Sequence, residues 1–266
     1  MDSFEDHLDD SKNRWEENAQ FWDEYMGNES NRFHRELIRP FTENLLGNVK
    51  DLSVLDIACG NGNFSRRLAD LGANVIAFDC SKTMIERAIK RSEEYIEKIQ
   101  YKVIDATDYK TLISLGIERF HTAVSNMGLM DIADVGPLLS ALYKILRFNG
   151  VFVFSIVHPC FQSPGMKKYI EQEEINNQIV KRSCIMIYRY KNSESNLGIS
   201  IAKQPVPTRY FHRSLSDLLN LCFKNGFVLD ALEEPTFIAN ANQDKFEWTD
   251  IPPVIIFRIK KVKTST

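Results

Sequence analysis

Apolar and polar residues follow two different periods along the central part of the chain. Between Ser53 and His158, short apolar runs of the kind that form buried strands are separated by stretches with helical spacing. The pattern predicts strands at residues 54–57, 73–79, 99–106, 120–127 and 151–157, and helices at 63–71, 81–96 and 135–146. Strands that alternate with helices form βαβ units, so this region should build a parallel sheet covered by helices.

The first 50 residues carry helical patterning without such apolar runs. An aromatic-rich stripe is formed by Trp15, Phe21, Trp22, Tyr25 and Met26. Pro40 marks a break or the start of a new helix. The stripe can simply pack on the sheet, or it can form a lid over a cationic ligand, because aromatic faces attract cations.

Residues 159–211 interrupt the alternation of strands and helices. Segments 179–190 and 198–206 favour strands and flank a polar stretch, so an antiparallel hairpin is predicted. An insertion at this point leaves the sheet at its carboxyl edge, where ligands bind in open α/β folds. We expect it to cap a substrate site, and a surface excursion without a binding role stays open as the alternative. A helix at 214–225 and strands at 227–232 and 254–261 then complete the pattern.

The segment 54–64 carries the strongest chemical signal, since it reads as a buried strand, a glycine turn and the start of a helix. Gly60 and Gly62 lack Cβ atoms where the chain turns sharply, and backbone N–H groups at such a turn face a ligand. Asp56 lies near the carboxyl end of the strand, where a carboxylate can bind a cation. A dinucleotide-binding turn would have a third glycine at Ser65. A ligand with an ammonium group therefore fits better than a pyrophosphate.

Polar residues recur at the ends of the following strands. Asp79 comes roughly 20 residues after the glycine turn, the distance at which an acid reaches a ribose in doubly wound sheets. Asp105 ends the third predicted strand, and the fourth ends in Ser125, Asn126 and Met127. Because the carboxyl ends of parallel strands share one edge of a sheet, these groups should meet in a common cleft.

In their order along the chain, these motifs resemble those of class I S-adenosylmethionine-dependent methyltransferases. The matching segments are D-x-A-C-G-x-G at 56–62, D-x-S-x-x-M at 79–84, and L-R-F-N-G at 146–150, where the family usually has L-R-P-G-G. The resemblance is close over residues 50–160 and looser elsewhere. It implies an α/β fold with a Rossmann-like, doubly wound, mostly parallel sheet of seven strands, one of the last two running antiparallel. It also implies an N-terminal helical lid at 1–50 and a methyltransferase domain at 51–266, in which 159–211 is the substrate cap.

The resemblance assigns the glycine turn to the methionine part of S-adenosylmethionine. The backbone at Ala58, Gly60 and Gly62 would line that part, and Asp56 would hold its ammonium group. Asp79 would accept hydrogen bonds from both ribose hydroxyls, because a carboxylate offers two acceptor oxygens. The plainer alternatives are a tight turn for the glycines and a helix cap for Asp79.

Further residues would bind the adenine and border the transferred methyl group. Cys80 and Met84 would pack on the faces of the ring, although Met84 could also be ordinary core. Asp105 would accept from the adenine amino group, with the Ala106 N–H donating to a ring nitrogen, and a solvated strand-end acid is the alternative for Asp105. The methyl group would be bordered by Ser125, Asn126 and Met127. The product of the reaction would be S-adenosylhomocysteine.

Methyl transfer itself is an in-line displacement, so the protein chiefly aligns the reactants and excludes water. A base helps where the nucleophile starts as a hydroxyl or an ammonium group. His158 and His212 are the catalytic candidates because each lies near the ligand edge, and a histidine bonded to the backbone is an equal alternative for both. Substrate contacts are expected from Trp22, Asp131, Tyr210 and Arg213. Asp131 is a third candidate base, and an ordinary ion pair is the alternative for Arg213.

Composition limits the classes of partner. The chain has 266 residues, a net charge of −3 and a pI near 6.0, which disfavours nucleic acid. It has no apolar run of membrane-spanning length, its acidic start is no signal peptide, and its five cysteines lack C-x-x-C spacing. We therefore expect a cytoplasmic protein with a small-molecule substrate, no metal, and no nucleic-acid or membrane partner. A homodimer is left open.

The function that the sequence favours is transfer of a methyl group from S-adenosylmethionine to an O, N or C atom of a small molecule. One alternative is a nucleotide-dependent oxidoreductase on a similar sheet, and Ser65 and Asp56 argue against it. The other is a sensor that binds the cofactor without catalysis. A substrate-sized cavity beside the methyl position would argue against a sensor.

Overall fold

A seven-stranded sheet forms the centre of the computed structural model, which describes residues 7–238 and 246–263. The strand order is β10-β11-β5-β4-β1-β2-β3, and β11 alone runs antiparallel to its neighbours β5 and β10. This is the predicted doubly wound sheet. The strands are β1 (Ser53–Ile57), β2 (Asn74–Asp79), β3 (Ile99–Val103), β4 (Phe120–Asn126), β5 (Leu146–Val157), β10 (Phe227–Glu233) and β11 (Val254–Lys261).

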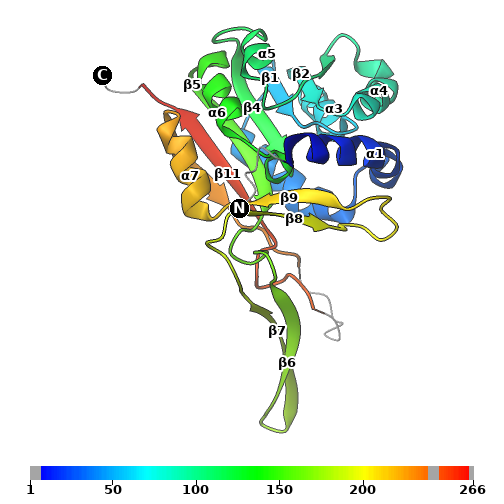
Figure 1. Ribbon diagram of the computed structural model, residues 1–266, viewed down its shortest axis with the longest axis vertical. Helices are drawn as coiled ribbons and strands as arrows, with labels where there is room; N and C mark the ends of the chain where they lie inside the picture. Colours follow the sequence, from blue (N-terminus) through cyan, green and yellow to red (C-terminus); the bar gives the residue numbers. More distant parts are fainter. Residues whose placement is uncertain (1–6, 239–245, 264–266) are drawn as a thin grey trace.

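Helices cover both faces of the sheet (Figure 1). Successive residues of a strand point to opposite faces, so Val54 packs with Leu68 of α3, whereas Leu55 joins the core formed by α6 and α7. The predicted helices at 63–71, 135–146 and 214–225 are confirmed, and the one at 81–96 ends earlier, at Arg91. The helices are α2 (Arg39–Leu46), α3 (Asn63–Asp70), α4 (Lys82–Arg91), α5 (Tyr109–Ile113), α6 (Gly136–Ile145) and α7 (Leu215–Lys224).

The N-terminal part of the chain is helical, as its spacing predicts. Helix α1 (Leu8–Met26) lies against α4 and against strand β9, as Figure 1 shows in dark blue. A π-helical turn, η2 (His34–Ile38), leads into α2, and Pro40 lies in the first turn of α2. Proline is tolerated there because the first helical N–H groups have no intrahelical partner.

The insertion after β5 differs from its prediction. The predicted strand at 198–206 is wrong, since residues 199–207 form the connection between the two strands of a second hairpin. Segment 179–190 does contain a strand, but that strand pairs within a first, separate hairpin. Strand β6 (Lys167–Ile175) pairs with β7 (Gln178–Met186), and β8 (Glu194–Gly198) pairs with β9 (Thr208–His212). The first hairpin turns at Asn176 and Asn177, whose φ angles of +52° and +60° suit a two-residue hairpin turn.

The two hairpins lie differently relative to the sheet. The β6–β7 hairpin projects away from the body of the protein, whereas β8–β9 lies beside α1 (Figure 1). The second hairpin therefore lies along the carboxyl edge of the sheet with α1, whereas the first reaches this edge only through its base at Lys168. In the part of the chain that the structure describes, no helix is long and apolar enough to cross a membrane.

Candidate active site

A cavity of about 990 Å³ lies at the carboxyl ends of the central strands. Its walls come from the strand ends, from α1 and from the β8–β9 hairpin. Most of the residues predicted for the site line this one cavity, namely Trp22, Asp56, Ala58, Gly60, Asp79, Cys80, Met84, Asp105, Ala106, Asn126, Met127, Asp131, Tyr210, His212 and Arg213.

Three predicted residues are not among those that line the cavity. Gly62 begins α3 with φ +75°, and a Cβ atom there would collide with the Tyr101 hydroxyl, so this glycine serves the packing of the turn. Ser125 is fully buried and its hydroxyl has no hydrogen-bond partner among the described residues. His158 is also buried, with its ring directed to Glu234.

The glycine turn is tied to the end of the neighbouring strand. Ala58 and Gly60 both have positive φ angles, +53° and +54°, which turn the backbone sharply after β1. The Gly60 N–H donates to Asp79 Oδ2 at 2.9 Å, and the Ser81 N–H donates to Asp79 Oδ1 at 3.0 Å. Asp79 therefore fixes the turn and also the start of α4.

Asp79 keeps acceptor capacity that a ligand can use. Each of its oxygens receives one backbone N–H, and a carboxylate has about four lone-pair sites. The side chain is buried, and this burial raises the pKa of Asp79 above its ordinary value. Two hydroxyl donors would fill the remaining sites and stabilise the charged form.

Asp56 lies deeper in the same cavity. The Ser65 hydroxyl donates to its Oδ2 at 2.5 Å, so the residue in place of a third glycine supports the carboxylate. Burial raises the pKa of Asp56 to about 7, and the charge of Asp79 adds to the effect. A ligand ammonium group beside it would favour the ionised form.

Asp105 is held from two sides. Thr107 donates to Oδ1 from its N–H at 2.8 Å and from its hydroxyl at 2.7 Å, and Lys12 Nζ of α1 donates to Oδ2 at 2.9 Å. Burial raises the pKa of Asp105, but these hydrogen bonds outweigh it and lower the pKa below its ordinary value. The carboxylate stays ionised, and its Oδ2 binds α1 to the sheet through Lys12.

The far wall of the cavity is formed by the loop after β4, which contains the short helix η4 (Leu129–Asp131). Arg213 supports this loop, since Nη2 donates to the carbonyls of Ile132 at 2.7 Å and Ala133 at 2.6 Å. Burial lowers the pKa of Arg213 to about 10. Its guanidinium holds backbone carbonyls of this loop, and the substrate contact expected of Arg213 stays a prediction.

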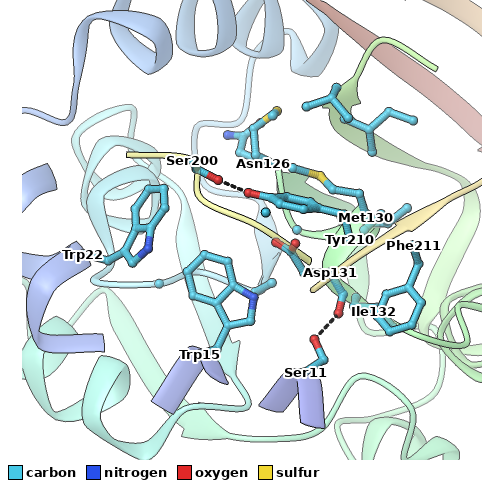
Figure 2. Close-up of a pocket in the computed structure, with 18 of the residues that line it drawn as sticks. Ser11, Trp15, Trp22, Asn126, Met130, Asp131, Ile132, Ser200, Tyr210 and Phe211 are labelled. Carbon is cyan, nitrogen blue, oxygen red and sulfur yellow. Dashed lines mark hydrogen bonds between the residues drawn. The ribbon is translucent and has the colours of Figure 1, made fainter. Parts of the chain in front are cut away.

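Asp131, at the end of η4, faces the cavity from that wall (Figure 2). Its Oδ1 is buried and has no hydrogen-bond partner among the described residues. The same is true of the indole nitrogens of Trp15 and Trp22 on α1. Buried polar atoms without partners are uncommon in folded proteins, so these three indicate where a ligand binds.

A family model described as a methyltransferase domain matches residues 48–204, which is more than half of the chain. The chain belongs to this methyltransferase family. The protein is an S-adenosylmethionine-dependent methyltransferase, as are many proteins that share its fold.

Relatives of known sequence agree with the family match. An uncharacterized protein of Haemophilus influenzae is 25% identical over 229 residues, which are 85% of this chain and 87% of that protein. The malonyl-[acyl-carrier protein] O-methyltransferase of Pseudescherichia vulneris is 34% identical over 110 residues, 41% of each chain. The methyltransferase thus spans most of the first relative but less than half of the second.

Solved structures show the same fold. A putative S-adenosylmethionine-dependent methyltransferase from Listeria monocytogenes superposes with a TM-score of 0.66 at 22% identity, covering 84% of this chain and 97% of the other. An S-adenosylmethionine-dependent methyltransferase from Mesorhizobium loti gives 0.65 at 24% identity, with 84% and 96% covered.

The cavity of the methyltransferase fits the cofactor. Asp79 has free acceptor sites for a ribose, Asp56 suits an ammonium group, and the turn at Gly60 has no Cβ to obstruct a close ligand. Met84 and Cys80 line the cavity next to Asp79. S-adenosylmethionine would supply a methyl group on a sulfonium, and these residues would hold and orient it.

Four contacts that the sequence analysis missed fasten α1 over this cavity. Glu16 accepts from the Ser81 hydroxyl at 2.6 Å and from the Thr83 hydroxyl at 2.5 Å. Asp23 accepts from Asn61 Nδ2 at 3.0 Å and also binds Arg91. No spacing rule within one helix could reveal these pairs, because the partners are far apart in the chain.

Replacing Glu16 with alanine is expected to lower the free energy of unfolding by about 1–2 kcal/mol, because Glu16 adds acceptors at the start of α4 and joins α1 to it. Urea denaturation would measure the change. Glu17→Ala, at the neighbouring exposed position, is the matched control and should change stability by less than about 0.5 kcal/mol. Equal effects of the two variants would contradict the assignment.

His158 has both ring nitrogens engaged. Its Nδ1 accepts from the Cys160 N–H at 3.2 Å, and its Nε2 lies 2.8 Å from Glu234 Oε1. Burial lowers the pKa of His158, although Glu234 acts in the opposite direction. These contacts tie the end of β5 to the segment after β10.

His158→Ala is therefore expected to lower the free energy of unfolding by about 1–2 kcal/mol while leaving the turnover of the folded enzyme intact. Denaturation curves and initial rates at saturating cofactor would measure the two quantities. A hundredfold loss of turnover in a variant of unchanged stability would instead make His158 the base.

Proposed function

We propose that the methyltransferase transfers the methyl group of S-adenosylmethionine to an O, N or C atom of a small molecule. The observation that carries the proposal is the single cavity of about 990 Å³, which continues from the strand ends to Tyr210 and Arg213. Ligand cavities are typically about 300–1,000 Å³, so this one has room for a cofactor and a small substrate together.

In this proposal, residues 1–50 act as a lid and residues 159–211 as a cap. Asn18 of α1 donates from Nδ2 to the Val206 carbonyl at 2.9 Å and accepts from the Val206 N–H at 3.2 Å. Arg209 of β9 donates to Asp10 of α1 at 2.6 Å. Lid and cap would therefore move as a unit, and their closure would exclude water from the reacting groups.

His212 is the histidine that we propose as the base. It lines the cavity, and its Nε2 lies 2.7 Å from the Tyr190 carbonyl oxygen. Because a carbonyl can only accept, Nε2 carries the ring proton and Nδ1 is the nitrogen that can take a proton. In this role Nδ1 would accept the proton of the substrate nucleophile as the methyl carbon leaves sulfur.

Two relatives support transfer of the methyl group to an oxygen. They are named for methylation of an oxygen in malonyl-[acyl-carrier protein] and in ubiquinone biosynthesis. The two matches cover 41% and 52% of this chain, so their substrates are not carried over to the whole chain. The cavity that remains open beyond the cofactor residues argues against a sensor that only binds the cofactor.

Incubation of a cell extract with the enzyme and S-adenosylmethionine labelled in its methyl group tests the proposal. We expect a small labelled product in mass spectra, and S-adenosylhomocysteine should raise the melting temperature of the enzyme because it binds the folded state. Label that appears only in macromolecules would reject a small-molecule substrate. No melting shift with S-adenosylhomocysteine would reject the cofactor site.

A further inference from the structure

The wall that faces the cofactor residues joins one carboxylate with several aromatic rings. In Figure 2 the carboxylate of Asp131 is directed to the side on which Tyr210, Trp15 and Trp22 lie. The two indole rings are 5.4 Å apart between centroids and tilted by 48°. The main chain of Asp131 is fixed to α1, since Ser11 Oγ donates to its carbonyl at 2.8 Å. The backbone that carries Asp131 is therefore held beside the helix that carries the two indoles.

Acidic side chains without a cationic partner gather in this cavity. Asp56, Asp79 and Asp131 all line it, and none of them forms an ion pair with another described residue. S-adenosylmethionine carries one net positive charge, from its sulfonium, ammonium and carboxylate groups together. Three acids facing one net charge leave room for a second cation.

The cationic side chains that line the cavity are already engaged. Lys12 binds Asp105 and Asp9, and Arg213 holds the carbonyls of the loop after β4. The Lys168 ammonium lies over the Trp248 ring, 4.6 Å from its centroid. Asp131 is thus left without a cationic partner among the described residues. Burial raises its pKa well above the ordinary value, so a cationic group of a ligand beside it would favour the ionised form.

We infer that the substrate of the methyltransferase presents a cationic nitrogen to Asp131 between the rings of Trp15, Trp22 and Tyr210, an inference that rests on the proposed function. Indole and phenol faces attract ammonium groups, most strongly where water is excluded. A carboxylate at the same point adds a charge of opposite sign. The unpartnered indole N–H groups suit an oxygen acceptor carried by the same substrate or by the cofactor.

A pair of probes of equal shape tests the inference. Choline and its uncharged isostere 3,3-dimethylbutan-1-ol differ in one atom, a nitrogen that bears the charge. In calorimetric titrations of the enzyme saturated with S-adenosylhomocysteine, choline should bind at least about tenfold tighter than the alcohol. Equal affinities, or no binding of either probe at millimolar concentration, would overturn the inference.

Variants locate the effect. Asp131→Asn, which keeps the shape and removes the charge, should abolish the preference for choline, and Trp15→Leu should reduce it. Glu17→Gln removes one exposed acid from α1 outside the cavity and should retain the preference in full. An unchanged preference for choline over the alcohol in both cavity variants would overturn the inference. If Asp131→Asn does not fold, the result for Trp15→Leu decides by itself.

The cofactor provides the second readout. If Asp131→Asn weakens the binding of S-adenosylhomocysteine as much as it weakens the binding of choline, Asp131 binds the cofactor and the substrate inference is wrong. If the wild-type protein does not bind S-adenosylhomocysteine, the proposed function has failed before the inference is tested. The two failures are therefore distinguishable.

Discussion

Replacing Arg213 with methionine is expected to lower the free energy of unfolding by about 3–5 kcal/mol, because it leaves buried carbonyls of the loop after β4 without donors. Hydrogen bonds from a charged group are each worth about 1.5–3 kcal/mol, and methionine supplies no donor to the two carbonyls. Urea denaturation and the melting temperature would measure the effect. The loop carries Asp131, so turnover should fall as well.

Arg213→Lys is the matched control for this prediction. Lysine keeps the charge but not the planar guanidinium that reaches two carbonyls. The free energy of unfolding of Arg213→Lys should therefore lie between those of the wild type and the methionine variant. A methionine variant of full stability that fails only to bind an anionic substrate would contradict the structural role. In that case the substrate contact predicted from the sequence would stand.

Asp79→Ala is expected to weaken S-adenosylhomocysteine binding by about 1.5–3 kcal/mol, or roughly 10- to 150-fold. The carboxylate would lose its hydrogen bonds to a ribose, and the Gly60 N–H would lose the acceptor that fixes the glycine turn. Isothermal titration would measure the affinity. Stability should fall much less, because removing this carboxylate also removes the cost of its burial.

The control for Asp79 is Glu86→Ala, which removes an exposed acid from α4. Its affinity for S-adenosylhomocysteine should equal that of the wild type. Asp79→Asn should recover part of the loss, since an amide oxygen still accepts one hydrogen bond. Unchanged affinity in Asp79→Ala would remove this residue from the cofactor site.

Local patterns predicted the sheet well for a physical reason. A buried parallel strand must be apolar along its length, and a βα turn that approaches a ligand needs residues without bulky side chains, so both leave a signature within a few residues. The strands, the doubly wound order and the acids at the strand ends could therefore be predicted from the sequence. Asp56, Asp79 and Asp105 do line one cavity, as their places at the strand ends predicted.

The hairpins show where local patterns fail. Segment 198–206 has strand composition but forms a connection, because composition says neither where a strand ends nor which strand it pairs with. The signal for the first hairpin in the sequence is the pair Asn176 and Asn177, since asparagine tolerates the positive φ angles of a tight turn. The second hairpin is fixed by contacts with α1, such as Arg209 with Asp10, that lie almost the whole chain apart.

The sequence by itself determined the fold class and the cofactor edge, because those depend on spacings within single βα units. Tertiary structure alone decided which side chains line the cavity and which are engaged elsewhere. It turned His158 toward Glu234, bound Arg213 to backbone carbonyls, and left Asp131 unpartnered beside two indoles. These outcomes depend on what lies opposite each side chain after folding, and that neighbour comes from a distant part of the chain.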